Sequence, residues 1–195
     1  MSANNSTCSP LEASLDWCEG RPVLPGLRRR IYYTHKSNIT SWPTLAKDSV
    51  GRPTTAVYSG SFELKADTYW KHIDMLVNNS GITSEPQGEV PSQTQLNKLS
   101  AVHPGVDEAA SMLPAYVNNS DVVYLVQTAD GKYRVIGNEI YQSKSTASQD
   151  SGQGATGTAS TTLEVECTDM IAAPFYEGEI VVSATETINP QGSGN

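Results

Sequence analysis

The segment from residue 121 to residue 176 restricts the fold of this chain most strongly. Val122–Val126 is a short apolar run rich in β-branched residues, Ala129–Lys132 has the composition of a turn, and Tyr133–Gly137 returns as a second apolar run. This order predicts a β-hairpin. A low-complexity stretch of Ser, Thr, Gly and Ala follows at Ser143–Thr158, and we expect a flexible loop there.

A strictly alternating segment comes next, at Thr162–Thr168. Its apolar positions are Leu163, Val165 and Cys167, and its polar positions are Glu164, Glu166 and Thr168. Because successive side chains of a strand point to opposite faces, the pattern predicts a sheet with one buried face and one solvated, acidic face. No catalytic motif accompanies it, which indicates a protein that works through a built surface.

Three further strands are predicted, at Leu27–Tyr33, Thr54–Leu64 and Thr68–Val77. The third shows both helix and strand periodicity. The turn-forming residues 78–81 after it favour a strand that pairs with the next segment. That next segment, 82–101, is long and polar, and we expect a hairpin arm that leaves the domain.

Pro104–Asn118 is the one predicted helix, and Pro114 either kinks or ends it. The expected fold class is mainly β, of the α+β type. Two packed antiparallel sheets form a β-sandwich or barrel, with one flanking α-helix, an extended N-terminal arm and a long hairpin. We divide the chain into the arm (1–27), a β domain (28–184) and a flexible tail (185–195). Anchors of the arm are expected at Trp17, Val23 and Leu24.

The composition argues against several classes of protein. Hydrophobic residues make up 37% of the chain, which is low beside the 45–50% or so of a self-contained globule by a count that includes Gly. We therefore expect surfaces that partners complete. A net charge of −8 argues against a duplex-DNA-binding protein, which needs a basic face. Since neither a membrane-spanning apolar run nor a signal peptide is recognisable, we expect synthesis in a reducing cytosol.

The three cysteines fit that compartment. Cys167 lies on the apolar side of its strand and is expected to be a small core residue. Cys8 and Cys18 would form a disulfide only in an oxidising compartment.

Matches to catalytic motifs fail on their structural context. The segment Gly152–Gly157 has the G-x-G-x-x-G spacing of a dinucleotide-binding loop, but it precedes a strand pattern rather than a helix. The histidines, His35, His72 and His103, lack the paired spacing of a zinc site. We therefore expect no enzymatic activity, no cofactor and no metal.

Arg28, Arg29 and Arg30 form the only basic cluster of the sequence. In a chain this acidic, we expect the cluster at a subunit interface rather than on nucleic acid. Nine Tyr and three Trp against two Phe also suit half-buried interface positions, where one edge of the ring stays polar.

The order of these features resembles that of phage tail-tube proteins. The resemblance to the C-terminal half of that family rests on residues 122–126, 130–137, 150–152, 161–166 and 173–176. Earlier segments, at 60–64, 70–74 and 84–89, resemble tail or tube proteins of gut Bacteroidetes phages and prophages. Together the likeness spans residues 20–180.

The resemblance implies a subunit of six-fold rings that stack into a hollow tube, through which viral DNA passes at ejection. Strands of neighbouring subunits would complete a barrel around the lumen, and the arm and long hairpin would contact the next ring. The implied partners are other copies of the chain, the tape-measure, terminator and baseplate proteins of the tail, and DNA in transit without specific binding. No membrane is involved. The protein would be made in the host bacterial cytoplasm and located in the virion tail.

Within this resemblance, Glu164 and Glu166 are candidate lumen-facing residues, because an acidic wall would repel DNA. Candidate inter-subunit contacts are Trp17, Arg28, Arg29, Arg30, Glu85 and Glu89. Two alternatives stay open. One is a head–tail connector or tail terminator, which forms a single ring. The other is a β-sandwich carbohydrate-binding or adhesin module, whose stacking platforms would be Trp17, Trp42 and Trp70.

Overall fold

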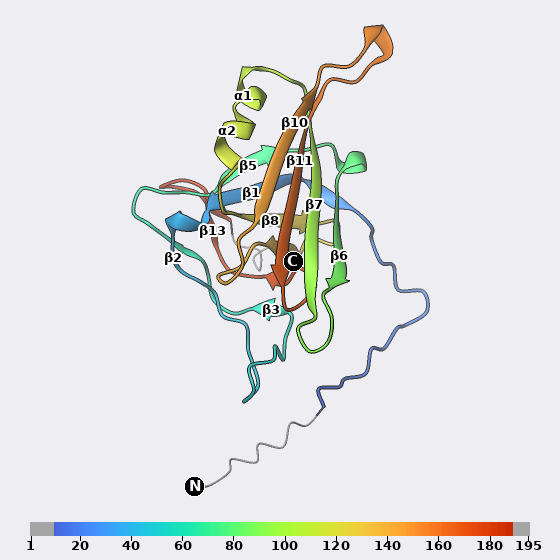
Figure 1. The fold of residues 1–195 in the computed structure, drawn as a ribbon, viewed down its shortest axis with the longest axis vertical. Coiled ribbons are helices and arrows are strands. Elements are labelled where there is room, and N and C mark those ends of the chain that lie inside the picture. Colours follow the sequence, from blue (N-terminus) through green and yellow to red (C-terminus); the bar gives the residue numbers. More distant parts are fainter. Residues whose placement is uncertain (1–9, 189–195) are drawn as a thin grey trace.

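Two packed β-sheets form the body of the protein (Figure 1). The structure is a computed structural model that describes residues 10–188. Strands hold 42% of the residues and helices 10%, which confirms the mainly β fold class. The long strands of one sheet cross those of the other steeply, as in orthogonally packed sheets.

The first sheet has six strands, in the order β3-β12-β9-β8-β1-β5. Their bounds are β3 Val57–Tyr58, β12 Phe175–Tyr176, β9 Tyr133–Ile136, β8 Val122–Thr128, β1 Leu27–His35 and β5 Lys71–Asp74. All neighbours are antiparallel except β3 and β12, which are parallel. The predicted hairpin at 122–137 is confirmed as β8 and β9.

The second sheet has four strands, in the order β10-β11-β7-β6, and every pair is antiparallel. Their bounds are β10 Lys144–Asp150, β11 Ser160–Asp169, β7 Thr94–Pro104 and β6 Gly81–Gln87. Smaller elements complete the fold. They are two two-stranded sheets, β2 Ile39–Ser41 with β4 Glu63–Leu64 and β13 Ile180–Val181 with β14 Thr187–Ile188, and the 3-10 turns η1 Lys36–Asn38, η2 Val77–Asn79 and η3 Gly154–Thr156.

The six-stranded sheet is buried on both of its faces. One face packs against the four-stranded sheet, where Tyr124 and Val126 meet Leu163 and Val165. The other face packs against the short hairpins and loops, through a second core around Trp70. This explains why Val122–Val126 is continuously apolar: all five side chains are fully buried, each worth about 1.5–3 kcal/mol to the folded state.

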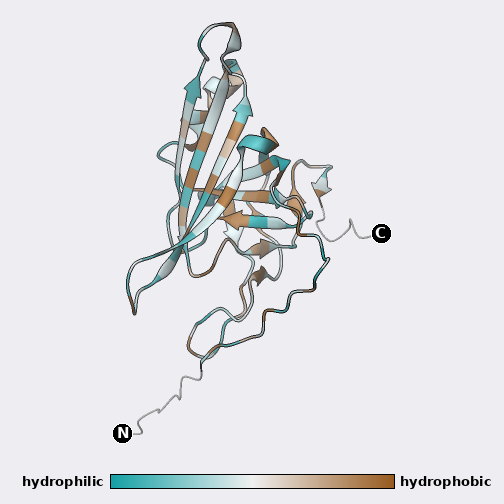
Figure 2. Cartoon of the chain, turned by 90° about the vertical axis from the view of Figure 1, so that its right-hand side faces the viewer, coloured by the Kyte–Doolittle hydropathy of each residue, from teal (hydrophilic) through white to brown (hydrophobic). Residues whose placement is uncertain are grey.

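The four-stranded sheet has one buried face and one solvated face, as the alternation in β11 predicts. Leu163, Val165 and Cys167 are at most 2% exposed, and Glu164 between them is exposed. Alternating apolar and polar bands along the long strands make the pattern visible (Figure 2).

Two short helices replace the single predicted helix. They are α1 Glu108–Ser111 and α2 Leu113–Val117. Asp107 caps α1 by accepting a hydrogen bond from the Ala110 backbone N–H at 2.8 Å. Pro114 lies in the first turn of α2, because in a continuous helix its ring would clash with the carbonyl of residue 110. The predicted start at Pro104 is wrong, since β7 runs to that residue.

The predicted loop at 143–158 is wrong for its first half. Residues Lys144–Asp150 form β10, which pairs with β11 along its whole length. The stretch has weak local strand signals, and the partner strand selects its conformation. The tip of this hairpin projects beyond the body of the protein, in orange in Figure 1.

The hairpin arm predicted at 82–101 exists as β6 and β7, but it does not leave the domain. β7 pairs with β11 from Gln95 to Pro104, so it is an inner strand of the four-stranded sheet. Its predicted partner, 68–77, contains β5, which pairs with β1 instead. The predicted strand at 54–64 is reduced to β3 and β4.

Both domain boundaries shift slightly. β1 begins at Leu27, one residue inside the predicted arm, and Leu27 is buried. Thr187 and Ile188 form β14, so the predicted tail begins too early; residues 189–195 lie outside the described range. The predicted anchors of the arm are wrong, because Trp17, Val23 and Leu24 are 59–78% exposed.

Cys167 is a buried core residue, as predicted, and burial raises the pKa of its thiol to about 12. Cys18 is exposed, whereas Cys8 lies outside the described residues, so the structure does not describe a bridge between them. We expect maleimide at neutral pH to label Cys18 within minutes and to leave Cys167 unlabelled until urea unfolds the protein, because the reagent reaches the exposed Cys18, whereas Cys167 is buried and its raised pKa disfavours the reactive thiolate. Peptide mass spectrometry reads the result, and labelling of Cys167 in the native protein would contradict the buried position.

Candidate assembly surface

The solvated face of the four-stranded sheet is a regular, mainly polar surface. Strand register fixes which side chains are neighbours across it. Glu164 of β11 lies between Thr146 of β10 and Ser100 of β7. Its Oε1 accepts a hydrogen bond from the Ser100 hydroxyl at 2.7 Å. The predicted lumen-facing position of Glu164 is therefore an exposed position on this face.

Glu166 also lies on this face, but between two lysines. The register places Lys144 of β10 on one side and Lys98 of β7 on the other. Lys98 makes an ion pair with Glu85 of β6, at 3.0 Å between Nζ and Oε2. Hydrogen bonding to Glu85 raises the pKa of Lys98. The face is therefore polar with mixed charge rather than purely acidic, and the sequence interpretation missed the two lysines.

Each side of this sheet ends in a strand of seven residues, β6 or β10, that has a strand partner on one side only within residues 10–188. Such edges expose backbone N–H and C=O groups that can pair with another chain. Pro86 in β6 suits an edge position, since proline cannot donate to a ladder hydrogen bond.

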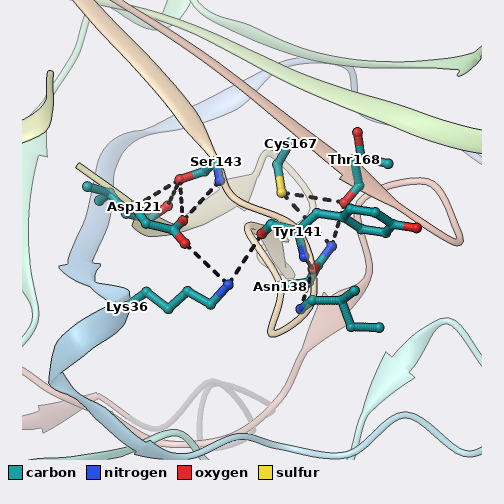
Figure 3. Close-up of polar contacts among 9 residues, drawn as sticks. Lys36, Asp121, Asn138, Tyr141, Ser143, Cys167 and Thr168 are labelled. Atoms are coloured by element: carbon teal, nitrogen blue, oxygen red, sulfur yellow. Dashed lines mark hydrogen bonds and ion pairs between the residues drawn. The ribbon is translucent and has the colours of Figure 1, made fainter. Parts of the chain in front are cut away.

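The outer edge of β10 is partly occupied by side chains from the segment that joins α2 to β8. The Asn118 Oδ1 accepts from the Ala147 backbone N–H at 3.0 Å. The Asp121 Oδ1 accepts from the Ser143 backbone N–H at 2.9 Å, and Lys36 holds Asp121 through an ion pair at 3.2 Å. Figure 3 shows this cluster around Ser143.

The three arginines predicted at an interface differ in their surroundings. Arg30 makes a two-bond ion pair with Asp74, at 2.7 and 3.0 Å, which lowers the pKa of that carboxyl. The guanidinium of Arg28 lies against the turn at Gly131, where a Cβ would come within 3.2 Å of its Nη2 atom. Arg29 is exposed, and its backbone carbonyl accepts from the Met75 N–H. Arg30 thus already has a partner within the subunit.

The other predicted contacts lie on projecting parts. Trp17 is 72% exposed in the N-terminal arm, which extends away from the body (Figure 1). Glu89 is exposed in the turn between β6 and β7, and its backbone carbonyl accepts from the Ser92 N–H. The structure brings Glu85, Glu164 and Glu166 onto one face and leaves Trp17, Glu89 and the arginines elsewhere.

A cleft of about 270 Å³ lies beside β3. Asn138 shapes one wall of it, because its Oδ1 accepts from the backbone N–H groups of Ile140 and Tyr141 and its Nδ2 donates to the Thr168 carbonyl (Figure 3). Asp169 in this cleft has its pKa raised by burial. The lining includes no histidine or cysteine. Across residues 10–188, no three His, Cys, Asp or Glu side chains gather as metal ligands.

No protein-family model, no curated protein and no solved structure matches this chain. In the described part of the chain, every helix is too short or too polar to cross a bilayer.

Proposed function

We propose that this protein is a tail-tube subunit of a phage, whose four-stranded sheet joins those of its neighbours into a ring around a DNA conduit. The observation that carries the proposal is the build of that sheet. It has a buried face, a polar face and a seven-residue strand at each edge with no second strand partner in the described chain.

Strand direction supports closure into a ring. The four strands alternate in direction, so β6 and β10 are antiparallel to each other. When copies are related by rotation about one axis, β6 of one copy therefore meets β10 of the next in the antiparallel orientation. Closing a sheet in this way removes its open edges. The interface is heterologous, because two different edges of the subunit meet.

The polar face would then surround the lumen. Glu164 and its direct neighbours Thr146 and Ser100 are polar, and the charges on this face are of both signs, so a wall of this kind offers passing DNA no strongly basic surface. The net charge of −8 supports the same use. The number of subunits per ring, six, comes from the resemblance alone.

Electron microscopy of the purified protein over a range of concentrations tests the proposal. Stacked rings or hollow tubes would support a tail tube. Single rings that never stack would favour a connector or terminator. A species that stays monomeric at every concentration, also when tail-tip complexes are added as initiators, would contradict the proposal.

The three tryptophans proposed as stacking platforms in the carbohydrate-binding or adhesin alternative are not all exposed. Trp70 is only 2% exposed and packs edge-to-face on Phe62. Trp42 is half-buried and also packs edge-to-face with Phe62, so Trp17 is the one tryptophan of the three that is largely exposed.

The double variant Glu164→Lys/Glu166→Lys is expected to form normal rings but to slow DNA ejection several-fold. Both side chains lie on the solvated face, so the fold tolerates the change. Two lost negative charges and two gained positive charges per subunit would make the wall attract phosphate groups. The measurement is the rate of DNA release from virions assembled with the variant. Glu63→Lys/Glu139→Lys is the matched control, since it makes the same charge change at exposed positions away from the sheet. An unchanged ejection rate would show that Glu164 and Glu166 do not line the lumen.

A further inference from the structure

Side chains of the subunit already accept hydrogen bonds from the outer edge of β10, where a neighbouring strand would pair in a ring. In an antiparallel strand, alternate residues direct their backbone groups to opposite sides. Because the Ala147 N–H donates to Asn118 rather than to β11, the odd-numbered residues of β10 direct their backbone groups outward. Ser143, just before the strand, follows the same alternation and donates to Asp121.

These contacts imitate part of a neighbouring strand. Asn118 and Asp121 accept the hydrogen bonds of the Ala147 and Ser143 N–H groups. An added strand would accept hydrogen bonds from the same groups. The outward N–H groups of Ser145 and Gln149 follow from the same alternation and have no such side-chain acceptor among the described residues. The edge is thus half-closed within the free subunit.

The two contacts differ in how firmly they are held. Asp121 is fixed by the ion pair with Lys36, by a second hydrogen bond from the Ser143 hydroxyl at 3.1 Å and by the Lys36 N–H, which donates to its carbonyl. Asn118 holds Ala147 through one amide oxygen. Its side chain borders an open groove of about 480 Å³ that runs between residues 118–120 and 142–146. Rotation of this one side chain into the groove frees the Ala147 N–H.

We propose that Asn118 is a removable cap on the assembly edge of β10, which protects the Ala147 N–H in the free subunit and gives way to a strand of a second copy when rings form. This inference rests on the proposed ring. The exchange replaces one amide oxygen by another at Ala147, so it costs little, whereas the bonds to Ser145 and Gln149 are new. The fixed Asp121 contact ends the added pairing at residue 144, which leaves 145–150 for the second copy.

Asn118→Ala removes the cap, and Asn118→Asp is the matched control because a carboxylate can still accept the hydrogen bond. In dilute monomer, hydrogen exchange at the Ala147 amide is expected to be about fivefold faster in Asn118→Ala, the effect of losing one modest hydrogen bond. The exchange rate should stay near the wild-type value in Asn118→Asp. The threshold concentration for rings should fall several-fold in Asn118→Ala and stay the same or rise in Asn118→Asp.

The outcomes separate the cap from the proposed function. Unchanged exchange at Ala147 in Asn118→Ala would show that no cap exists in solution and would overturn the inference. Faster exchange at Ala147 in Asn118→Ala, with rings that form at the wild-type threshold concentration, would show that assembly does not require displacement of Asn118. The proposed ring function would be unaffected by that result. Faster exchange without rings from either protein would overturn the proposed ring function and, with it, any role of the cap in assembly.

Discussion

Gln149→Pro is expected to abolish ring formation while the subunit stays folded. The Gln149 N–H points away from β11, as the alternation from Ala147 requires, so proline there removes a hydrogen bond that only a second copy could accept. The proline ring also blocks close approach of the neighbouring strand within the segment 145–150 that would pair with it. Size-exclusion chromatography with light scattering and electron microscopy would read the assembly state.

Gln149→Ala is the matched control for this variant. Both substitutions lose the same side-chain contacts, to Thr161 at 3.0 Å and to Ser111 at 3.3 Å, but alanine keeps the N–H. We expect the alanine variant to form rings and the free energies of unfolding of the two variants to agree within about 1 kcal/mol. Rings from Gln149→Pro at the wild-type concentration would show that the β10 edge takes no part in assembly.

Trp70→Ala is expected to lower the free energy of unfolding by about 3–5 kcal/mol, as measured by urea denaturation. Trp70 is the largest fully buried side chain of the second core and packs against Phe62, with 5.4 Å between ring centroids. Phe62 in turn contacts Tyr176 at 5.1 Å, so the cavity would lie at the centre of an aromatic cluster that cannot easily collapse. Much of the total stability of a small domain would be lost.

Trp17→Ala provides the comparison. The same chemical change in the exposed arm should alter the free energy of unfolding by no more than about 0.5 kcal/mol. A loss below 1 kcal/mol in Trp70→Ala would mean that the second core contributes little to the six-stranded sheet. An equal loss in both variants would mean that the arm packs on the body in solution.

The elements that were predicted correctly carry strong local patterns. The β8–β9 hairpin combines two apolar runs with a turn, and Gly131 adopts a φ of 92° that suits glycine. The alternation in β11 assigned Glu164 to the solvated face and Cys167 to the core. Both predictions rest on the period of the apolar residues and on the residues of the turn, which can be recognised within a short stretch of sequence.

The elements that were missed depend on distant partners. β10 is made of Ser, Thr, Ala and polar residues, and contacts with distant segments make it an ordered strand, above all its pairing with β11 and the hydrogen bond from the Tyr124 hydroxyl to Ser145. β7 was expected to leave the domain, since its own polar residues do not indicate that β11 will pair with it. The lysines beside Glu166 come from two separate strands, so no local pattern could place them there.

Which side chains of each strong strand face the core could be predicted from the sequence, because alternation with period two is a local property of an extended chain. The pairing of the strands depends on the whole fold. So do the two edges of the four-stranded sheet that have no second strand partner among the described residues, and the hydrogen bond from the Ala147 N–H to Asn118 at one of them. Those choices follow from long-range contacts, whose free energy depends on the packing of the whole domain rather than on the residues of any one strand.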